Sequence, residues 1–387
     1  MALTPHRDRL RTDVETLAGM VRDSAGPGER TSARWIAGRL REAGALEVRV
    51  EPFRYQSTYA GAHALHLVGG LAAARRGGLV GAALALAALV SLEREGSGRS
   101  QWVRRLLPAS EGANVVARIP PAPGGAPRRT LVLVAHHDAA RTGLVWHPRL
   151  VEPGAARRLR RRRIDPYMGP YAVALALAGA PWRPLRRAGA ALLGLSLLAG
   201  VDLGAGATVP GASDNATGVA ALLGLATRWA ADPLPGVEVR LVATGCEESG
   251  MGGMAAWLRA HGPALPPART LVLGLDTLGS GAPIVLGGEH AVRRQRYRPE
   301  DVAWADAGAA RAGLAPPERW TIGGWTDPIL ARHAGLPSLS LLSIGPKGVF
   351  TNYHRPTDTP ERVDWECVER CARLAAGVGE AFAAGVG

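Results

Sequence analysis

The sequence predicts an α/β fold in which helices flank a mixed, mostly parallel central β-sheet. Short runs of β-branched and leucine residues, of the kind that parallel sheets bury on both faces, alternate along the chain with helical stretches. The 387 residues are enough to bury a substantial core. A content of 47% hydrophobic and 20% charged residues excludes a disordered chain. We expect one domain over residues 1–387, enlarged by insertions.

The predicted elements follow one another as such a sheet requires. Helical periodicity begins at residues 14–22, and a second amphipathic stretch at 31–43 ends at Gly44, a typical helix stop. Residues 46–53 then alternate as in a strand, and 114–119 form an apolar run. Further strands are predicted at 130–135, 237–244, 270–275 and 338–343, and further helices at 217–230, 254–261, 303–312 and 365–384.

Two pairs of apolar segments interrupt this alternation. The first pair covers residues 60–74 and 78–92, and the second covers 167–181 and 188–201. Each segment has about 15 residues, fewer than the roughly 20 that a straight transmembrane helix needs. We expect two inserted hydrophobic helical hairpins, within residues 58–107 and 140–207.

Overall charge and cysteine content give little information about partners. The net charge of +13 would suggest an anionic partner, but Lys347 is the only lysine, and the abundance of Arg, Ala and Gly matches a GC-rich coding bias. No nucleic acid is expected, because aromatic residues make up only 5% and no recognised module surrounds the arginines. Three cysteines without CxxC spacing predict core thiols rather than disulfides or a thiolate metal site.

The first motif with chemical meaning directly follows the strand predicted at 130–135. Residues two apart in an extended backbone share a face, so His136 and Asp138 point the same way and His137 points the opposite way. A metal-bound imidazole commonly donates its second N–H to a carboxylate. We therefore predict His136 as a metal ligand supported by Asp138. Taken alone, the motif could also be a polar loop after a strand.

Two further acidic motifs lie next to predicted elements. Asp214 stands in the small-residue loop 211–218 before a helix, where it could cap the helix or bridge two cations. Glu247 and Glu248 follow an apolar strand, where they could form a solvated surface pair. Because adjacent side chains diverge, one glutamate can bind metal while the other takes a proton from a metal-activated water.

Asp276 and His354 complete the set. Each could be an ordinary turn or solvent-exposed residue, but each also comes after a predicted apolar strand. The motifs can therefore gather at the carboxyl edge of one open sheet, where α/β folds bind ligands. Two imidazoles and three carboxylates exceed the needs of one tetrahedral zinc and suit two ions that share a carboxylate. Zinc fits this donor set best, and other divalent metals such as cobalt or manganese stay open.

Taken in their order along the chain, the five motifs resemble those of the M28 family of zinc metallopeptidases, which includes aminopeptidases. They are Ala-His-x-Asp, Gly-Ala-x-Asp-Asn-Ala-x-Gly, the Glu-Glu pair, the strand-end Asp and Tyr-His-x-Pro-x-Asp-Thr. The resemblance covers residues 114–138 and 208 onward. It implies two zinc ions bridged by Asp214, with His136 and Asp276 on one and Glu248 and His354 on the other. It also implies Glu247 as general base, with Asp138 as the second catalytic residue.

The expected activity is zinc-dependent hydrolysis of peptide bonds by an exopeptidase of the aminopeptidase type, on a peptide or small amide. Tyr353 and Asp327 are expected to border the substrate pocket. The family also contains glutaminyl cyclases that use one zinc, and the presence of both His136 and Asp276 favours the two-metal peptidase. An amidase or cyclase-like enzyme, and an inactive membrane-bound module, are the alternatives.

The connection between the first two motifs is longer than in the family. Seventy-five residues, 139–213, separate Asp138 from Asp214, so this insertion must lie at the rim of the site. It holds the second apolar pair and an arginine run at 157–163, which suggests an anionic lipid surface as partner. The alternative is that both apolar pairs pack as a buried four-helix subdomain.

The expected location of the protein follows from its first residues and from the apolar segments. Residues 1–10 carry charges before any apolar run and do not resemble a cleavable signal peptide. We expect a membrane-associated protein whose catalytic domain lies in the cytoplasm, with a soluble cytoplasmic protein as the alternative.

Overall fold

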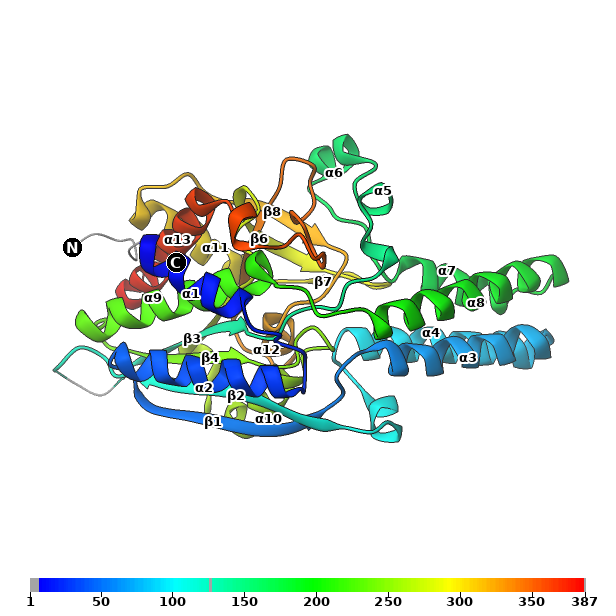
Figure 1. The fold of residues 1–387 in the computed structure, drawn as a ribbon, viewed down its shortest axis with the longest axis horizontal. Helices are drawn as coiled ribbons and strands as arrows, with labels where there is room; N and C mark the ends of the chain where they lie inside the picture. Colours follow the sequence, from blue (N-terminus) through cyan, green and yellow to red (C-terminus); the bar gives the residue numbers. More distant parts are fainter. Residues whose placement is uncertain (1–6, 125–126, 386–387) are drawn as a thin grey trace.

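A nine-stranded mixed sheet forms the centre of the computed structural model, which describes residues 7–124 and 127–385 (Figure 1). The strands are β1 (Leu46–Tyr55), β2 (Ser110–Ile119), β3 (Arg129–His136), β4 (Val237–Thr244), β5 (Thr270–Leu275), β6 (Ala282–Glu289), β7 (Gln295–Arg296), β8 (Glu318–Ile322) and β9 (Ser338–Ile344). Their order across the sheet is β1-β2-β4-β3-β5-β9-β6-β7, and β8 pairs with β6.

Four neighbouring strands in the middle of the sheet run parallel. β3 pairs in parallel with both β4 and β5, and β5 pairs in parallel with β9, whereas β2 and β6 join this group in the antiparallel sense. Every residue of β5 and β9 is buried, which explains why these strands are continuous apolar runs. The carboxyl ends of β3, β4, β5 and β9 therefore lie along one edge.

Helices cover the sheet in two groups. The first comprises α1 (Arg7–Ala18), α2 (Pro27–Glu42), α9 (Thr217–Ala231), α11 (Pro299–Ala312) and α13 (Trp365–Ala384), and the second comprises α10 (Gly252–His261) and α12 (Pro328–His333). Members of each group contact one another and the strands. The prediction of a mixed α/β fold with a central sheet flanked by helices is confirmed. β3, β4, β5 and β9 agree within two residues at each end with the strands predicted there.

Other elements differ from the predictions. The helix predicted at 14–22 lies at Arg7–Ala18, because the chain leaves the helix at Gly19 and turns so that Arg22 enters the core. β6, β8 and α12 were not predicted. The three cysteines are buried and free, as expected. Residues 1–6, part of the stretch judged unlike a signal peptide, lie outside the described residues.

The two apolar pairs form four helices that project from the body as a bundle (Figure 1). They are α3 (Ala60–Arg76), α4 (Gly78–Gly96), α7 (Gly169–Ala178) and α8 (Arg183–Ala205). A small core that includes Leu67, Leu175 and Leu193 joins them. At Gly70 an added Cβ would lie 2.4 Å from Leu175, so this glycine lets α3 and α7 approach closely. α8 is longer than predicted, since the arginines expected in a connection lie within its first turns.

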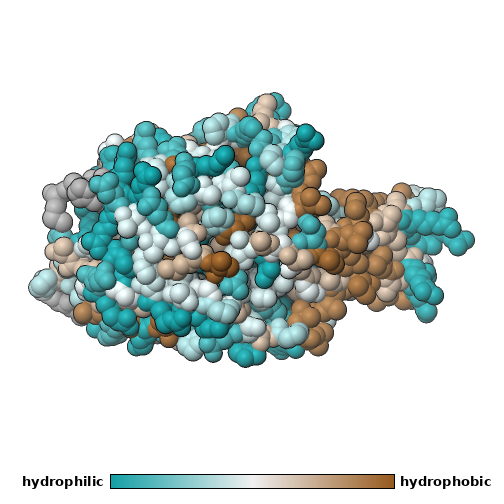
Figure 2. Space-filling view, in the orientation of Figure 1, coloured by the Kyte–Doolittle hydropathy of each residue, from teal (hydrophilic) through white to brown (hydrophobic). Residues whose placement is uncertain are grey.

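The outer surface of this bundle is apolar. Figure 2 shows a hydrophobic band along the projection and a hydrophilic tip at its far end. Large apolar side chains such as Leu79, Leu86 and Val201 are 91%, 61% and 69% exposed. Among the described residues, α8 alone is long and apolar enough to cross a membrane, judged by length and composition, and only 17% of its most apolar window is buried.

Candidate metal centre

Five predicted ligands lie together at the carboxyl edge of the parallel strands. His136 is the last residue of β3, Asp276 directly follows β5, and Glu248 lies in the turn after β4. Asp214 stands in the irregular turn Ala212–Ala216 before α9, and His354 lies in the loop after β9. The edge therefore collects side chains that are far apart in the sequence, as expected for parallel strands.

The two carboxylate oxygens of Asp214 face two different groups. His136 Nε2 lies 3.3 Å from Asp214 Oδ1 and 3.7 Å from Asp276 Oδ1. On the other side, His354 Nε2 lies 3.3 Å from Asp214 Oδ2 and 3.2 Å from Glu248 Oε2. Each side thus offers one imidazole and two carboxylates, and Asp214 belongs to both.

Several of these buried atoms lack a hydrogen-bond partner. Asp214 Oδ2, Glu248 Oε1 and His354 Nε2 are each buried without one. Leaving a buried polar atom unpaired costs about 1–3 kcal/mol, and more for a charged group. One atom each of His136, Asp214 and Glu248 lie within 4.8 Å of one another, which fits a metal ion. The nitrogen and oxygen donors present are those that zinc accepts.

The protonation equilibria of the cluster are strongly shifted. Burial opposes the charged form of His354, yet the neighbouring carboxylates of Glu248 and Asp214 raise its pKa to about 10. Burial likewise acts to raise the pKa of Asp214, but the nearby imidazoles of His136 and His354 hold it below its usual range. The carboxylates therefore attract positive charge into a buried site, and divalent cations can supply it.

Glu247 and Glu248 diverge from their turn. Burial raises the pKa of Glu248 to about 7 and that of Glu247 well above its usual value. Glu247 and Glu248 line a narrow cavity of about 20 Å³ beside His136, Asp214 and Asp276. Glu247 thus lines the same cavity as four of the candidate ligands, and burial favours its protonated form unless cations lie close by.

Asp138 lies beneath the ligands and organises them. It is fully buried, and its two oxygens each accept a hydrogen bond of 3.1 Å, one from the backbone N–H of Glu247 and one from that of Glu248. His136 Nδ1 lies 3.2 Å from the backbone oxygen of Asp138 and 3.5 Å from its carboxylate. Asp138 lines none of the cavities at this edge, so it positions other groups. His137 points the opposite way, toward Ser32, as predicted.

Sequence reasoning missed a set of buried residues that hold the ligand loops. The carboxylate of Asp358 accepts hydrogen bonds from the backbone N–H groups of Ser213 and Asp214. Arg22, wholly buried, donates to the backbone oxygens of His137, Pro210 and Gly211. Glu29 accepts from the backbone of Ala113 and Cys246. The one sequence signal among these residues is that Asp358 is the Asp of the Tyr-His-x-Pro-x-Asp-Thr motif.

Three ligand-bearing loops contain non-glycine residues with left-handed backbone. φ is 55° at His354, 53° at Cys246 before Glu247, and 50° at Thr277 after Asp276. Such conformations are uncommon outside glycine and cluster at functional sites, where the surrounding structure enforces them. The buried hydrogen bonds of Asp138 and Asp358 are part of that surrounding structure.

The two predicted pocket residues have different surroundings. Tyr353 lines the narrow cavity and stacks on His354, with 3.8 Å between ring centroids. Asp327 is buried, accepts a short hydrogen bond from Thr244 and lines none of the cavities at this edge. Trp146, from the insertion, packs edge-on against His354 at 4.4 Å, and Tyr167 stacks on Tyr353. Side chains of residues 139–213 therefore lie beside the site.

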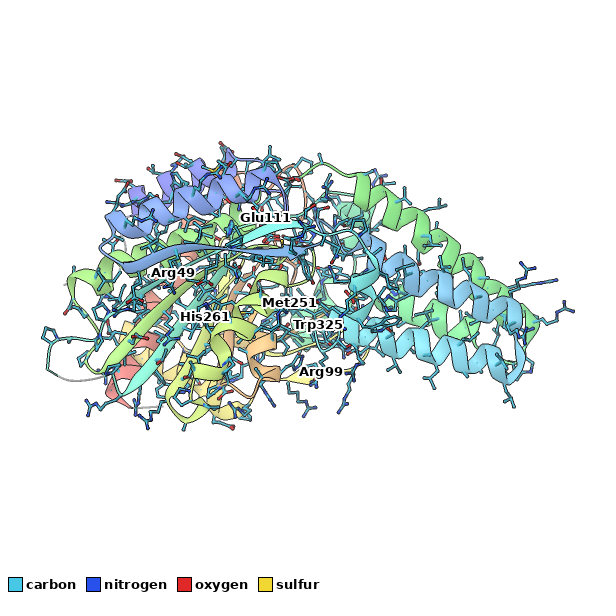
Figure 3. All side chains as sticks on the ribbon, turned by 90° about the horizontal axis from the view of Figure 1, so that it is seen from below. Arg49, Arg99, Glu111, Met251, His261 and Trp325 are labelled. Atoms are coloured by element: carbon cyan, nitrogen blue, oxygen red, sulfur yellow. The ribbon has the colours of Figure 1, made fainter. Side chains whose placement is uncertain are left out.

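A larger cavity adjoins this edge. It has a volume of about 580 Å³ and includes Glu247, Glu248 and His354 at one end and residues of α7 and α8 at the other. Met251 and Trp325, which also line it, lie where the body meets the bundle (Figure 3). The candidate metal centre therefore communicates with the base of the bundle.

Comparison with known families gives one match. The model of peptidase family M28 matches residues 197–379, which include Asp214, Glu247, Glu248, Asp276 and His354. His136 precedes the matched segment. The resemblance to this family that the motifs indicated is confirmed. No curated protein sequence matches the chain.

Solved structures share the fold at low sequence identity. The aminopeptidase from Aneurinibacillus sp. strain AM-1 superimposes with a TM-score of 0.57 and 15% identity, over 98% of this chain and 94% of that one. BSAP, a zinc aminopeptidase from Bacillus subtilis, gives 0.58 and 14%, over 98% and 95%. Bacteroides thetaiotaomicron glutaminyl cyclase gives 0.58 and 14%, over 97% and 98%. The central fold is therefore shared by aminopeptidases and cyclases.

Proposed function

We propose that this protein is a metallopeptidase that hydrolyses peptide bonds with two zinc ions, as an exopeptidase of the aminopeptidase type. The match of residues 197–379 to peptidase family M28 supports the peptidase class, and the zinc aminopeptidase among the similar structures supports the metal. In this proposal the five ligands are His136, Asp214, Glu248, Asp276 and His354, and Glu247 is the catalytic base.

One observation carries the two-ion proposal. The oxygens of Asp214 lie 3.3 Å from His136 on one side and 3.3 Å from His354 on the other. A single ion held by His136, Asp214 and Glu248 would leave the imidazole of His354 and the carboxylate of Asp276 without a metal. A pair of ions that share Asp214 uses all five side chains.

The chemistry divides between the ions and the protein. When bound, the ions would polarise the scissile carbonyl and lower the pKa of a water between them. Glu247 would take a proton from that water as it attacks and deliver it to the leaving amine nitrogen. Asp138 would hold the backbone of Glu247 in place, and Tyr353 would pack against the substrate. Asp327, further from the cavity, would act through Thr244 rather than by direct contact.

A cyclase-like amidase is the second candidate. Glutaminyl cyclases occur among the similar structures, with identities as low as those of the aminopeptidases. Five ligands in two groups favour the peptidase, because the cyclases of the family use one zinc. The intact set of ligands and base argues against an inactive module.

The proposal predicts chelator-sensitive cleavage of small amides. The purified full-length chain should hydrolyse chromogenic amino-acid anilides, lose this activity after treatment with a chelator, and regain it when zinc is added. A glutaminyl peptide serves as the parallel substrate. Release of ammonia from its amino-terminal glutamine, without cleavage of the anilides, would contradict the peptidase and favour the cyclase.

We propose further that the body is one peptidase domain over residues 1–387, with membrane-associated insertions at 58–107 and 140–207. A soluble bundle would carry polar residues on its outer face, yet large apolar side chains cover this one. α8, with 23 residues, is about 34 Å long, enough to cross the core of a bilayer. Arg75, Arg76 and Arg187 near the tip could reach lipid headgroups. The cytoplasmic location of the catalytic domain stays a prediction.

Membrane fractionation of a tagged full-length chain tests this part. We expect the protein to stay in the membrane pellet after washes with high salt and with alkaline carbonate, because burial of apolar side chains is insensitive to both. Release by salt alone would indicate a purely electrostatic contact. Complete recovery in the soluble fraction without any wash would contradict membrane association.

A further inference from the structure

The large cavity extends from the candidate metal centre to the apolar bundle. Glu247, Glu248 and His354 lie in its wall at one end, and Leu195, Ala199 and Leu203 of α8 lie in its wall at the other. At about 580 Å³ it is far larger than the narrow cavity of about 20 Å³ beside the ligands, and it falls within the usual range for small-molecule sites. Of the three cavities described beside the candidate ligands, the one with room for a substrate extends toward the bundle.

Apolar side chains flank the opening of this cavity. Leu195 of α8 and Leu150 of α5 (Pro148–Val151) both line it and are 64% and 67% exposed. Leu195 belongs to the same outer face of α8 as Leu198 and Val201, which are 68% and 69% exposed. The cavity is thus continuous with the hydrophobic band in Figure 2.

Charged groups in the wall are partly paired with one another, and Arg158 donates to the backbone oxygens of Glu152, Pro153 and Lys347. Glu95 and Arg104 form an ion pair and are only 1% and 6% exposed. Arg157 pairs with Asp165 near the surface. Aromatic and apolar side chains such as Tyr171, Met168 and Trp325 complete the wall. A peptide that extends into this space would find few partners for its backbone groups, whereas a hydrocarbon chain needs none.

We propose that the substrate is an amphiphilic amide whose long hydrocarbon chain occupies this cavity and enters between α5 and α8. The scissile amide lies at the metal centre, and the chain extends toward the bundle. This inference rests on the proposed function, because the amide is the bond that the centre would hydrolyse. It narrows the substrate class from peptides in general to amides that partition into lipid.

Two homologous series of amides test the proposal. Leucine n-alkylamides place the chain on the leaving amine, and anilides of 2-aminoalkanoic acids place it on the acyl side. We expect kcat/KM in one series to rise about two- to fourfold for each added methylene over the medium chain lengths, below the concentration at which micelles form. Values that stay flat or fall with chain length in both series would overturn the proposal.

A binding measurement separates this inference from the proposed function. The Glu247→Gln chain is loaded with dansylaminoundecanoic acid, a fluorescent probe with a hydrocarbon chain, and the amides are added as competitors. Displacement of the probe that strengthens with the chain length of the amide supports the cavity assignment. It does so even if the unmodified chain cleaves no amide, a result that would contradict only the proposed peptidase activity. Absence of probe binding would overturn the cavity assignment.

Matched substitutions on α8 locate the chain. Ala199 lines the cavity, whereas Ala191 on the same helix is exposed and lies outside it. Ala199→Phe should lower the ratio of long-chain to short-chain kcat/KM about tenfold, because the added ring would fill space in the cavity that a long chain needs. Ala191→Phe should leave the ratio unchanged. Equal ratios in both variants would place the hydrocarbon chain elsewhere and overturn the assignment.

Discussion

Replacing Glu247 by Gln should reduce kcat for amide hydrolysis by roughly 10²- to 10⁴-fold while the metal content stays that of the unmodified chain. The amide keeps the size of the side chain and its place in the turn after β4, but it cannot accept a proton from water. Glu247 is not among the five candidate ligands, so its loss should not release an ion. Single-turnover kinetics together with elemental analysis of the same preparation provide the measurement.

A matched substitution distinguishes this effect from a general loss of charge. Glu300 in the first turn of α11 is exposed, with its side chain 71% accessible, and lies on an element that does not border the site. Glu300→Gln should leave kcat unchanged. If Glu247→Gln retained normal turnover, another group would have to move the proton. If it lost metal, Glu247 would be a ligand.

The clustering of the candidate ligands was predictable because their signal in the sequence is local. β3, β4, β5 and β9 are buried apolar runs, and a polar residue that ends or follows such a run stands out in the sequence. Parallel pairing then places the ends of these strands at one edge, so that His136 and Asp276 meet although 139 residues lie between them. Neither step needs knowledge of side-chain packing.

The residues that hold the ligands were not predictable, because their partners are distant and lack any pattern. Glu29 accepts hydrogen bonds from the backbone of Ala113 and of Cys246, which are 84 and 217 positions away. From the sequence alone, Glu29 is an ordinary acidic residue in the first turn of an amphipathic helix. Asp358 belongs to the motif that begins at Tyr353, but its two backbone contacts at Ser213 and Asp214 exist only in the folded chain.

The boundaries of the bundle helices also depend on tertiary structure. Hydropathy predicted a connection at 182–187 because three arginines lie there, but α8 begins at Arg183 with Pro184 in its first turn, a position that suits proline. At the tip of the bundle Arg183 and Arg187 are exposed, and Arg186 donates hydrogen bonds to the backbone oxygens of Ala74 and Pro181, so all three can lie in a helix without burying an unpaired charge. The same insertion brings Trp146 to 4.4 Å from His354, a contact that no pattern in the sequence indicates.

Asp214→Asn should remove both ions, because each oxygen of this carboxylate faces a different imidazole. His136→Ala and His354→Ala should each remove mainly the ion on its own side, so the three variants together distinguish a bridge from a simple ligand. A ligand present at 100 times its Kd stabilises the folded state by about 2.7 kcal/mol per site. The unfolding free energy gained on adding zinc should therefore vanish in Asp214→Asn and fall by about half in the histidine variants.

Elemental analysis and thermal unfolding with and without zinc measure these effects, with Asp232→Asn as the matched control. Asp232 is exposed at the end of α9, the helix that Asp214 precedes, so the same chemical change there should alter neither metal content nor the stabilisation by zinc. Because each oxygen of Asp214 lies 3.3 Å from a different imidazole, we expect Asp214→Asn to release both ions and not one of them. An Asp214→Asn chain that lost only one ion would show that the two groups bind metal independently, and one that kept both would remove Asp214 from the centre.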